Sequence, residues 1–158
     1  MTVKMTGAAQ MIAALNKQLK MPETLIRKKV KELIHYAHYS ITERTPVWSG
    51  QSLRNWVWSM DQASTTTLEA IDNGPPGPTN SMPLGSEPRR PPNQASSDAT
   101  FMALSYNNPF RNYILTNNAP DIIKLEYGQL PTAASSRSPA GMVRITVQEL
   151  LEKLKTGR

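Results

Sequence analysis

Two histidines on one predicted helix are the side chains best placed for chemistry in this sequence. His35 and His38 are three residues apart, a spacing that can bring two imidazoles to one metal ion. The remaining ligands are missing, because the chain has no cysteine and neither an HExxH motif nor a comparable acidic arrangement accompanies the pair. Helical spacing places His35 toward solvent and His38 at the edge of the buried stripe. We therefore predict no metal site and no cofactor.

The sequence also gives little indication of a nucleophilic serine, a phosphate-binding loop or an acid catalyst. The G-x-S-x-G motif of a nucleophilic serine does not occur, although a Ser/His/Asp arrangement stays open because its members need only meet in space. The run at 74–77 (GPPG) lacks the backbone N–H groups that cradle a phosphate. Asp121 follows Pro120 and is explained by a helix dipole. The sequence predicts a protein that is not an enzyme and has no small-molecule substrate.

Three tryptophans fall within eleven residues. Beside Arg44 and Arg54 they could form a stacking platform for bases. Trp56 and Trp58 are two apart on a predicted strand, so they share one face, and we predict that they fill the core under the long helix. Trp48 lies in a Pro/Gly turn, where a large ring gains little unless a partner covers it.

The net charge of +6 favours an acidic partner such as nucleic acid. The basic residues gather in three groups, at 27–31, at Arg89 and Arg90, and at 153–158. The first and last groups lie on predicted helices that also carry glutamates, so a solvated helix face also explains them. A basic nucleic-acid-binding module that uses Arg27, Lys28, Lys31 and the tryptophans is the alternative function.

The chain length of 158 residues suits a single domain, residues 1–158. No stretch approaches the roughly 20 apolar residues that cross a bilayer, and the N-terminus lacks the apolar run of a signal peptide. We expect a soluble, non-exported protein with no membrane partner.

Apolar periodicity predicts three main helices. Residues 6–20 form a short amphipathic helix, and residues 22–44 form a long one that begins at Pro22 and ends at Thr45-Pro46. The tail from residue 141 is a C-terminal helix whose buried stripe comprises Val143, Val147, Leu150, Leu151 and Leu154. A short helix is expected at 120–127, ended by Gly128.

Strands are predicted at 56–60, at 110–116 and, as the hairpin partner of the first, at 65–71. Residues 73–98 contain seven prolines and should form an extended loop without helix or sheet. A second loop is expected at 129–141. The fold class is α+β, with the long N-terminal helix and the C-terminal helix packed on a small antiparallel sheet.

Three segments together resemble phage tail-completion and neck proteins, including the minor tail protein Z group. Residues 45–50 (TPVWSG) and 55–56 (NW) resemble the family's T-P-V-D-T-G…N-W. Residues 117–120 (NNAP) and 125–128 (LEYG) resemble N-N-x-P-Y-A-x-x-L-E-Y-G, and residues 139–147 (PAGMVRITV) resemble P-x-G-M-V-R-x-T-V. The order and separation match over residues 23–154. Trp48 replaces the usual Asp and Asp121 the usual Tyr, which puts local partner contacts in doubt.

The resemblance implies a structural virion protein that completes the tail and joins it to the head connector. It implies a homo-oligomeric ring of six or, alternatively, twelve copies, in contact with a connector or stopper protein and with a tail terminator or tail tube. DNA in the channel is a further expected partner, and assembly is expected in the host cytoplasm. The loops at 73–97 and 129–140 are expected to carry contacts, and we predict pairing of Glu126 with Arg144. The predicted partner-contact residues are Trp48, Arg89, Arg90, Asn117, Asn118, Glu126, Tyr127, Met142 and Arg144.

Overall fold

The computed structural model describes residues 22–71, 87, 89–129 and 141–156 and has an α+β fold. The described elements are α2 (Glu23–Arg44), α3 (Gln51–Arg54), β1 (Trp56–Met60), α4 (Arg90–Met102), β2 (Tyr113–Asn117), α5 (Ile122–Glu126) and α7 (Val143–Thr156). The helix predicted at 6–20 and most of the two predicted loops lie outside the described residues.

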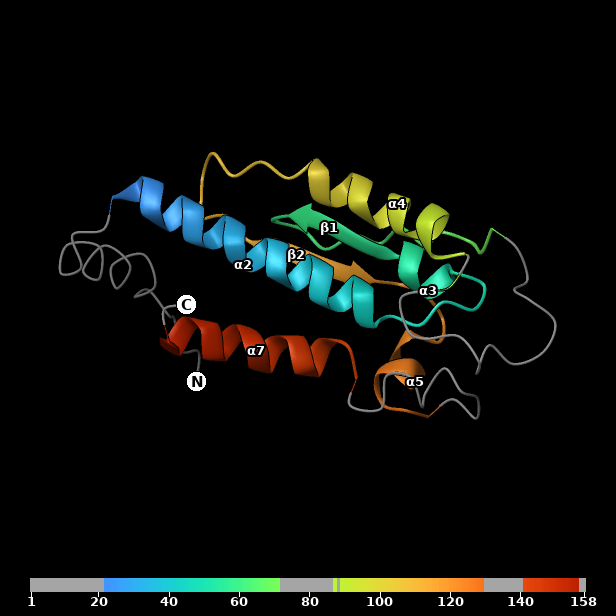
Figure 1. The fold of residues 1–158 in the computed structure, drawn as a ribbon. Coiled ribbons are helices and arrows are strands. Elements are labelled where there is room, and N and C mark those ends of the chain that lie inside the picture. The colour runs from blue at the N-terminus through green and yellow to red at the C-terminus, as the bar shows by residue number, and fades with distance from the viewer. Residues whose placement is uncertain (1–21, 72–86, 88, 130–140, 157–158) are drawn as a thin grey trace, which may run out of the picture.

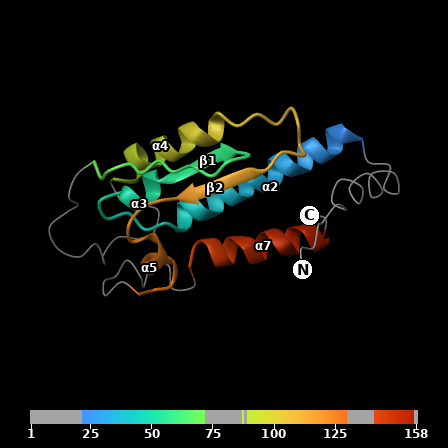
Figure 2. The ribbon, with the colours of Figure 1, turned by 180° about the vertical axis from the view of Figure 1, so that it is seen from behind.

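Helix α2 is the axis of the molecule and has the bounds that the sequence predicts. Pro22 precedes its first turn, and Thr45 leaves the helical conformation before Pro46 while its hydroxyl donates to the Ile41 carbonyl at 2.7 Å. In Figures 1 and 2, α4 lies beside the sheet and α7 lies on the opposite side of α2. The first turn of α2 and the last turn of α7 lie at the same end of the molecule.

The sheet pairs β1 with β2 in antiparallel register, with Trp58 opposite Leu115. The prediction that residues 65–71 pair with β1 as a hairpin is therefore wrong. That segment has no regular structure and is held by side chains: Asn55 Nδ2 donates to the Leu68 carbonyl at 2.7 Å, and the Leu68 N–H donates to Asn55 Oδ1 at 2.7 Å. An asparagine thus replaces a strand neighbour.

Two clusters of buried side chains form the core between α2, the sheet and the flanking helices. One joins α2 and β1 to the carboxyl-terminal elements through Ile41, Val47, Leu53, Trp56, Leu125 and Met142. The other joins α2, β1 and α4 through Ile34, Ala37, Trp58 and Phe101. Both strand tryptophans are buried, as predicted. They cannot form a stacking platform for bases.

The predicted proline-rich loop ends earlier than expected, because α4 begins at Arg90 and takes Pro91 and Pro92 into its first turn. Proline is compatible with this position, since the first N–H groups of a helix have no intrahelical partner. The prediction of no helix up to residue 98 is therefore wrong. Gly50 packs directly against this helix: a Cβ built at residue 50 would lie 1.9 Å from Asn93 Nδ2.

Helix α7 is present as predicted, but it packs with a different face. Its buried residue is Thr146, whose hydroxyl donates to Ser40 Oγ of α2 at 3.0 Å. Glu149 accepts from Tyr36 Oη at 2.9 Å and from Arg44 Nη2 at 2.8 Å. The predicted buried stripe is largely exposed, at Val147, Leu151 and Leu154.

Candidate partner-contact surface at the α5 corner

The second resemblance motif begins with two asparagines that fix the turn after β2. Asn117 Nδ2 donates to the Ser52 carbonyl at 2.7 Å, and its Oδ1 accepts the Ala119 N–H at 3.0 Å. Asn118 Nδ2 donates to the carbonyls of Ser64 and Thr66 at 3.0 and 2.9 Å. Both side chains are thus used within the chain, and they anchor the 63–71 segment and the start of α5.

Glu126, at the end of α5, caps the start of α7. Its carboxylate accepts the backbone N–H groups of Met142, Val143 and Arg144 at 2.7, 3.0 and 3.0 Å. These donors have no carbonyl partner inside the helix, and an anion is also favoured there by the helix dipole. Glu126 is only 8% exposed. The carboxylate therefore ties the second resemblance motif to the third.

The predicted Glu126–Arg144 pair is present, though it is the weaker part of this junction. Arg144 Nε lies 3.4 Å from Glu126 Oε1, whereas Arg144 Nη2 donates to the Glu126 backbone carbonyl at 2.9 Å. Gly141 makes the close approach possible, because its φ is +83° and a Cβ there would lie 2.5 Å from Glu126 Oε1. Steric crowding against Glu126 thus explains why the motif has a glycine before Met142.

Around this junction three side chains face outward, and we call Ile123, Tyr127 and Arg144 the α5 corner. Ile123 is 67% exposed and Tyr127 is 57% exposed. The Arg144 guanidinium lies 4.8 Å from the centre of the Tyr127 ring. An exposed aliphatic side chain beside an arginine–tyrosine stack is typical of a protein contact surface. Ile123 was not among the predicted contact residues, because only the fold shows which face of a short helix is open.

Three predicted contact residues have buried side chains that are used within the chain: Glu126, described above, Met142 and Arg90. Met142 is fully buried in the first core cluster. Arg90 is 7% exposed and completes the end of α2: Nη1 donates to the Thr42 carbonyl at 2.7 Å and Nη2 to the Thr45 carbonyl at 2.6 Å. Its Nε pairs with Glu87 at 3.0 Å. The guanidinium satisfies carbonyls that a helix end leaves without donors.

Two other predicted contact residues have side chains of intermediate exposure. Trp48 and Arg89 are both half-buried, and Arg89 interacts within the chain. Of the nine residues, Tyr127 and Arg144 remain as outward-facing side chains at one place.

The two histidines serve the core. His38 is completely buried: its Nδ1 accepts from Trp58 Nε1 at 3.2 Å, so Nε2 carries the proton that it donates to Asp98 Oδ1 at 2.8 Å. Burial lowers the pKa of His38, and the neighbouring Asp98 only partly opposes this shift. His35, predicted to face solvent, is half-buried with its ring 4.7 Å from that of Phe101. Within the described residues no group of three or more potential ligands could hold a metal ion.

A basic groove lies near the start of α2, away from the α5 corner. Its lining includes Arg27, Lys28 and Lys31 together with Tyr106, and its volume is about 490 Å³. Lys31 Nζ lies 5.8 Å from the centre of the Tyr106 ring. Arg27 Nη2 pairs with Glu23 Oε1 at 2.8 Å, so the positive charge of Arg27 is partly neutralised within the chain. The groove offers cations and one aromatic ring to an anionic ligand.

Comparisons of the chain with protein-family models, with curated proteins and with solved structures find no match. No helix among the described residues has the length and apolar character needed to cross a membrane.

Proposed function

We propose that this protein is a structural component of a tailed-phage neck, which completes the tail and joins it to the head connector as a homo-oligomeric ring. The ring has six copies or, alternatively, twelve, and its neighbours are a connector or stopper protein and a tail terminator or tail tube. It acts in the virion through shape and surface, without catalysis, after assembly in the host cytoplasm. DNA passing through the channel is a further partner.

The observation that carries this proposal is the junction of motifs at α5. The LEYG segment and the GMVR segment resemble neck proteins in sequence, and in the fold Glu126 bonds one directly to the other. Since fourteen residues separate Gly141 from Glu126 in the chain, this bonding gives a physical reason for the two motifs to occur together. The resemblance therefore rests on residues that build one structural unit.

The α5 corner supplies a surface through which such a ring can form. Ile123 and Tyr127 are one helical turn apart and both exposed, and Arg144 adds a cation beside the aromatic ring. Aromatic residues and arginine are enriched in contact surfaces between proteins. A ring requires each copy to present two complementary patches, and we assign the α5 corner to one of them.

The test is the mass of the native particle. The purified chain, alone or added to finished tails, is expected to form closed rings, and Ile123→Asp with Tyr127→Ala should abolish them. Lys124→Ala is the matched control, because Lys124 is exposed on the same helix and its ammonium pairs with the neighbouring Asp121. Phage lacking the gene should give filled heads and unattached tails. A chain that stays monomeric on tails, or a gene deletion that leaves normal infectious particles, would contradict the proposal.

Nucleic-acid binding is the second candidate function, and the basic groove favours it. Lys28 and Lys31 are exposed on α2, and the ring of Tyr106 lies near Lys31 and stacks on Tyr113 of β2. The tryptophans take no part, since Trp56 and Trp58 are buried. A gel shift that weakens steeply from low to physiological salt, and that Lys28→Ala with Lys31→Ala removes, would support it. If binding changes neither with salt concentration nor with these substitutions, nucleic-acid binding through the basic groove is excluded.

A further inference from the structure

The outer edge of β2 carries backbone hydrogen-bonding groups that the fold does not use. On β1 the Trp58 N–H points away from β2, because it donates to Thr100 Oγ1 of α4 at 3.0 Å. Trp58 lies opposite Leu115, and opposing residues of an antiparallel pair turn their backbone groups either toward each other or both outward. The outward N–H and C=O groups of β2 therefore belong to Tyr113, Leu115 and Asn117. In the part of the chain that the structure describes, these groups have no hydrogen-bond partner.

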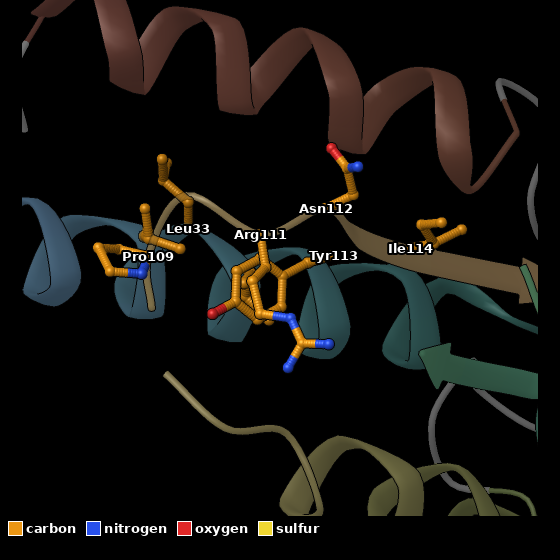
Figure 3. A pocket seen from close by; sticks show the side chains of 8 residues that line it. Leu33, Pro109, Arg111, Asn112, Tyr113 and Ile114 are labelled. Atoms are coloured by element: carbon orange, nitrogen blue, oxygen red, sulfur yellow. The ribbon is translucent and has the colours of Figure 1, made fainter. Parts of the chain in front are cut away.

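Exposed apolar side chains of α7 lie next to this edge. Helix α7 runs alongside β2 on the side away from β1 (Figures 2 and 3). Around α7, at about 100° per residue, Thr146 faces α2, and Leu150 and Val143 come next and pack against the core clusters that Leu115 also contacts. The next positions in the same direction are about half exposed, and we call them the α7 strip: Leu154, Val147 and Leu151. The strip therefore continues the core-facing side of α7 beyond the edge of β2.

The unused edge and the α7 strip are two sides of one open site. A strand added to β2 would lie about 4.8 Å beyond it, against the strip. The strip spans about 10 Å along the helix, a length that about three strand residues match. At the start of the edge a groove of about 550 Å³ opens between Tyr113 and Ile114 of β2 and Leu33 of α2 (Figure 3). The site thus combines backbone donors and acceptors on one side with apolar side chains on another.

We propose that this site, which we call the β2–α7 groove, binds an extended segment of a partner protein as a third strand of the sheet. The segment pairs its backbone with the outer edge of β2, and its alternate side chains are apolar and pack on the α7 strip. Arg144 and Lys155 are exposed on the outer side of the strip, so acidic residues near the ends of the segment complement the groove. The groove is complete within one copy, and the inference therefore does not depend on the proposed ring.

A second copy of the chain does not fit the groove by antiparallel pairing of β2 with β2. Such pairing would place the helix-covered faces of the two sheets on the same side. Within each copy α2 covers this face, where Ile34 packs with Trp58 and Leu115. The helices of the second copy would then overlap α7 of the first. A single extended segment with no helix behind it avoids this overlap.

Peptide selection on the purified full-length chain tests the proposal, with a random-sequence display library as the probe. Selected peptides should have apolar residues at alternate positions and acidic residues near their ends. One selected peptide is then synthesised in two forms, each methylated on the backbone nitrogens of one of the two alternating sets. The set that faces β2 should weaken binding by at least about tenfold, because the outward carbonyls of β2 lose their donors. The other set, which faces solvent, should weaken it by less than about threefold.

Two matched variants of α7 locate the bound peptide. Leu151→Ser should weaken binding by about tenfold, because the peptide loses an apolar contact on the strip. Gln148→Ser, which is exposed on the same helix outside the strip, should change it by less than about threefold. The proposal is overturned if no peptide is enriched, if the two variants bind equally, or if the two methylated peptides bind equally. A dimer of the chain that the peptide dissociates would assign the groove to a second copy and would also overturn it.

Discussion

Replacement of Glu126 by alanine tests whether one carboxylate holds the carboxyl-terminal helix to the rest of the molecule. The substitution removes the acceptor for three backbone N–H groups at the start of α7, at 2.7–3.0 Å, and for Arg144 Nε at 3.4 Å. The Met142 N–H is buried, so water cannot easily replace the lost acceptor.

The expected loss of stability follows from these contacts. Loss of a helix cap costs about 1 kcal/mol, and an anion at a partly buried helix start contributes up to about 2 kcal/mol. Leaving a buried donor without a partner adds about 1 kcal/mol or more. Since these effects overlap, we expect Glu126→Ala to lower the free energy of unfolding by about 3 kcal/mol. Glu126→Gln, which keeps an acceptor oxygen but loses the charge, should lower it by about half as much.

Arg144 separates capping from ion pairing. Its side chain is about half exposed, so the ion pair with Glu126 contributes less than about 1 kcal/mol. Its bond to the Glu126 backbone carbonyl survives in Glu126→Ala. Glu126→Ala should therefore destabilise the Arg144→Ala variant nearly as much as it destabilises the original chain, with a coupling below about 1 kcal/mol.

Urea unfolding measures these differences, with tryptophan fluorescence as the probe and one fixed protein concentration. The five chains compared are the original, Glu126→Ala, Glu126→Gln, Arg144→Ala and the double variant. For a chain of this size a loss of about 3 kcal/mol corresponds to about 9 °C in Tm. A coupling as large as the whole effect of Glu126→Ala would show that the ion pair is the main interaction. A loss below about 1 kcal/mol for Glu126→Ala would refute the capping role itself.

Three further predictions concern the core and the helix ends. Gly50→Ala should lower the free energy of unfolding by more than about 2 kcal/mol, because φ is +88° and the Cβ would overlap Asn93. Gly128→Ala should lower it by only about 1 kcal/mol in the same urea titration, because φ is +65° but no described atom lies within 4 Å of the new Cβ. Arg90→Ala should lower it by about 3 kcal/mol, because the buried Glu87 loses the guanidinium and the α2 carbonyls lose their donor. Arg90→Lys should not restore it, and Arg111→Ala, which breaks the exposed pair with Asp61, should leave the urea midpoint nearly unchanged. Burial lowers the pKa of His38, so the folded state binds fewer protons than the unfolded state near pH 6. Stability should be full above about pH 6.5 and fall as pH drops toward the lowered pKa. Unfolding curves between about pH 5 and 7.5 should show this slope for the original chain and a smaller one for His38→Gln, with the remainder due to His35, whose pKa burial also lowers; a slope unchanged by His38→Gln would contradict the prediction.

The sequence predicts the elements of this fold better than it predicts their partners. Local signals determine the bounds of α2, because Pro22 and Thr45-Pro46 act on the backbone beside them. The partner of β1 lies more than fifty residues away at Tyr113–Asn117, and residues 65–71 have an equally strand-like composition. The other edge of β1 is taken by α4, because Ser97 Oγ donates to the Trp56 carbonyl at 2.8 Å and the Trp58 N–H donates to Thr100 Oγ1 at 3.0 Å. Asn55 holds Leu68 beside the start of the strand. No periodicity carries that information.

For the predicted contact residues, too, the sequence predicts which segments are neighbours but not which side chains are buried. The motif segments were identified correctly as neighbours, because Glu126 and Arg144 can be paired by charge alone. Burial of Met142 and Arg90 could not be read from the sequence, since a buried arginine depends on carbonyls at the end of another helix. Exposure of Ile123 is likewise a property of the assembled fold.

Helix α7 shows why amphipathic periodicity does not identify the packed face. The apolar stripe of α7 is real, but α2 presents Tyr36, Ser40 and Arg44 on the side that α7 covers. A polar partner selects the face with Thr146 and Glu149, because buried hydroxyl and guanidinium groups require hydrogen-bond partners. The apolar stripe is then turned away from α2, at Val147, Leu151 and Leu154. Val143 and Leu150 of the same stripe still pack against the two core clusters, so the exposed part is limited to Val147, Leu151 and Leu154. An exposed apolar strip of this kind is available for contact with other proteins.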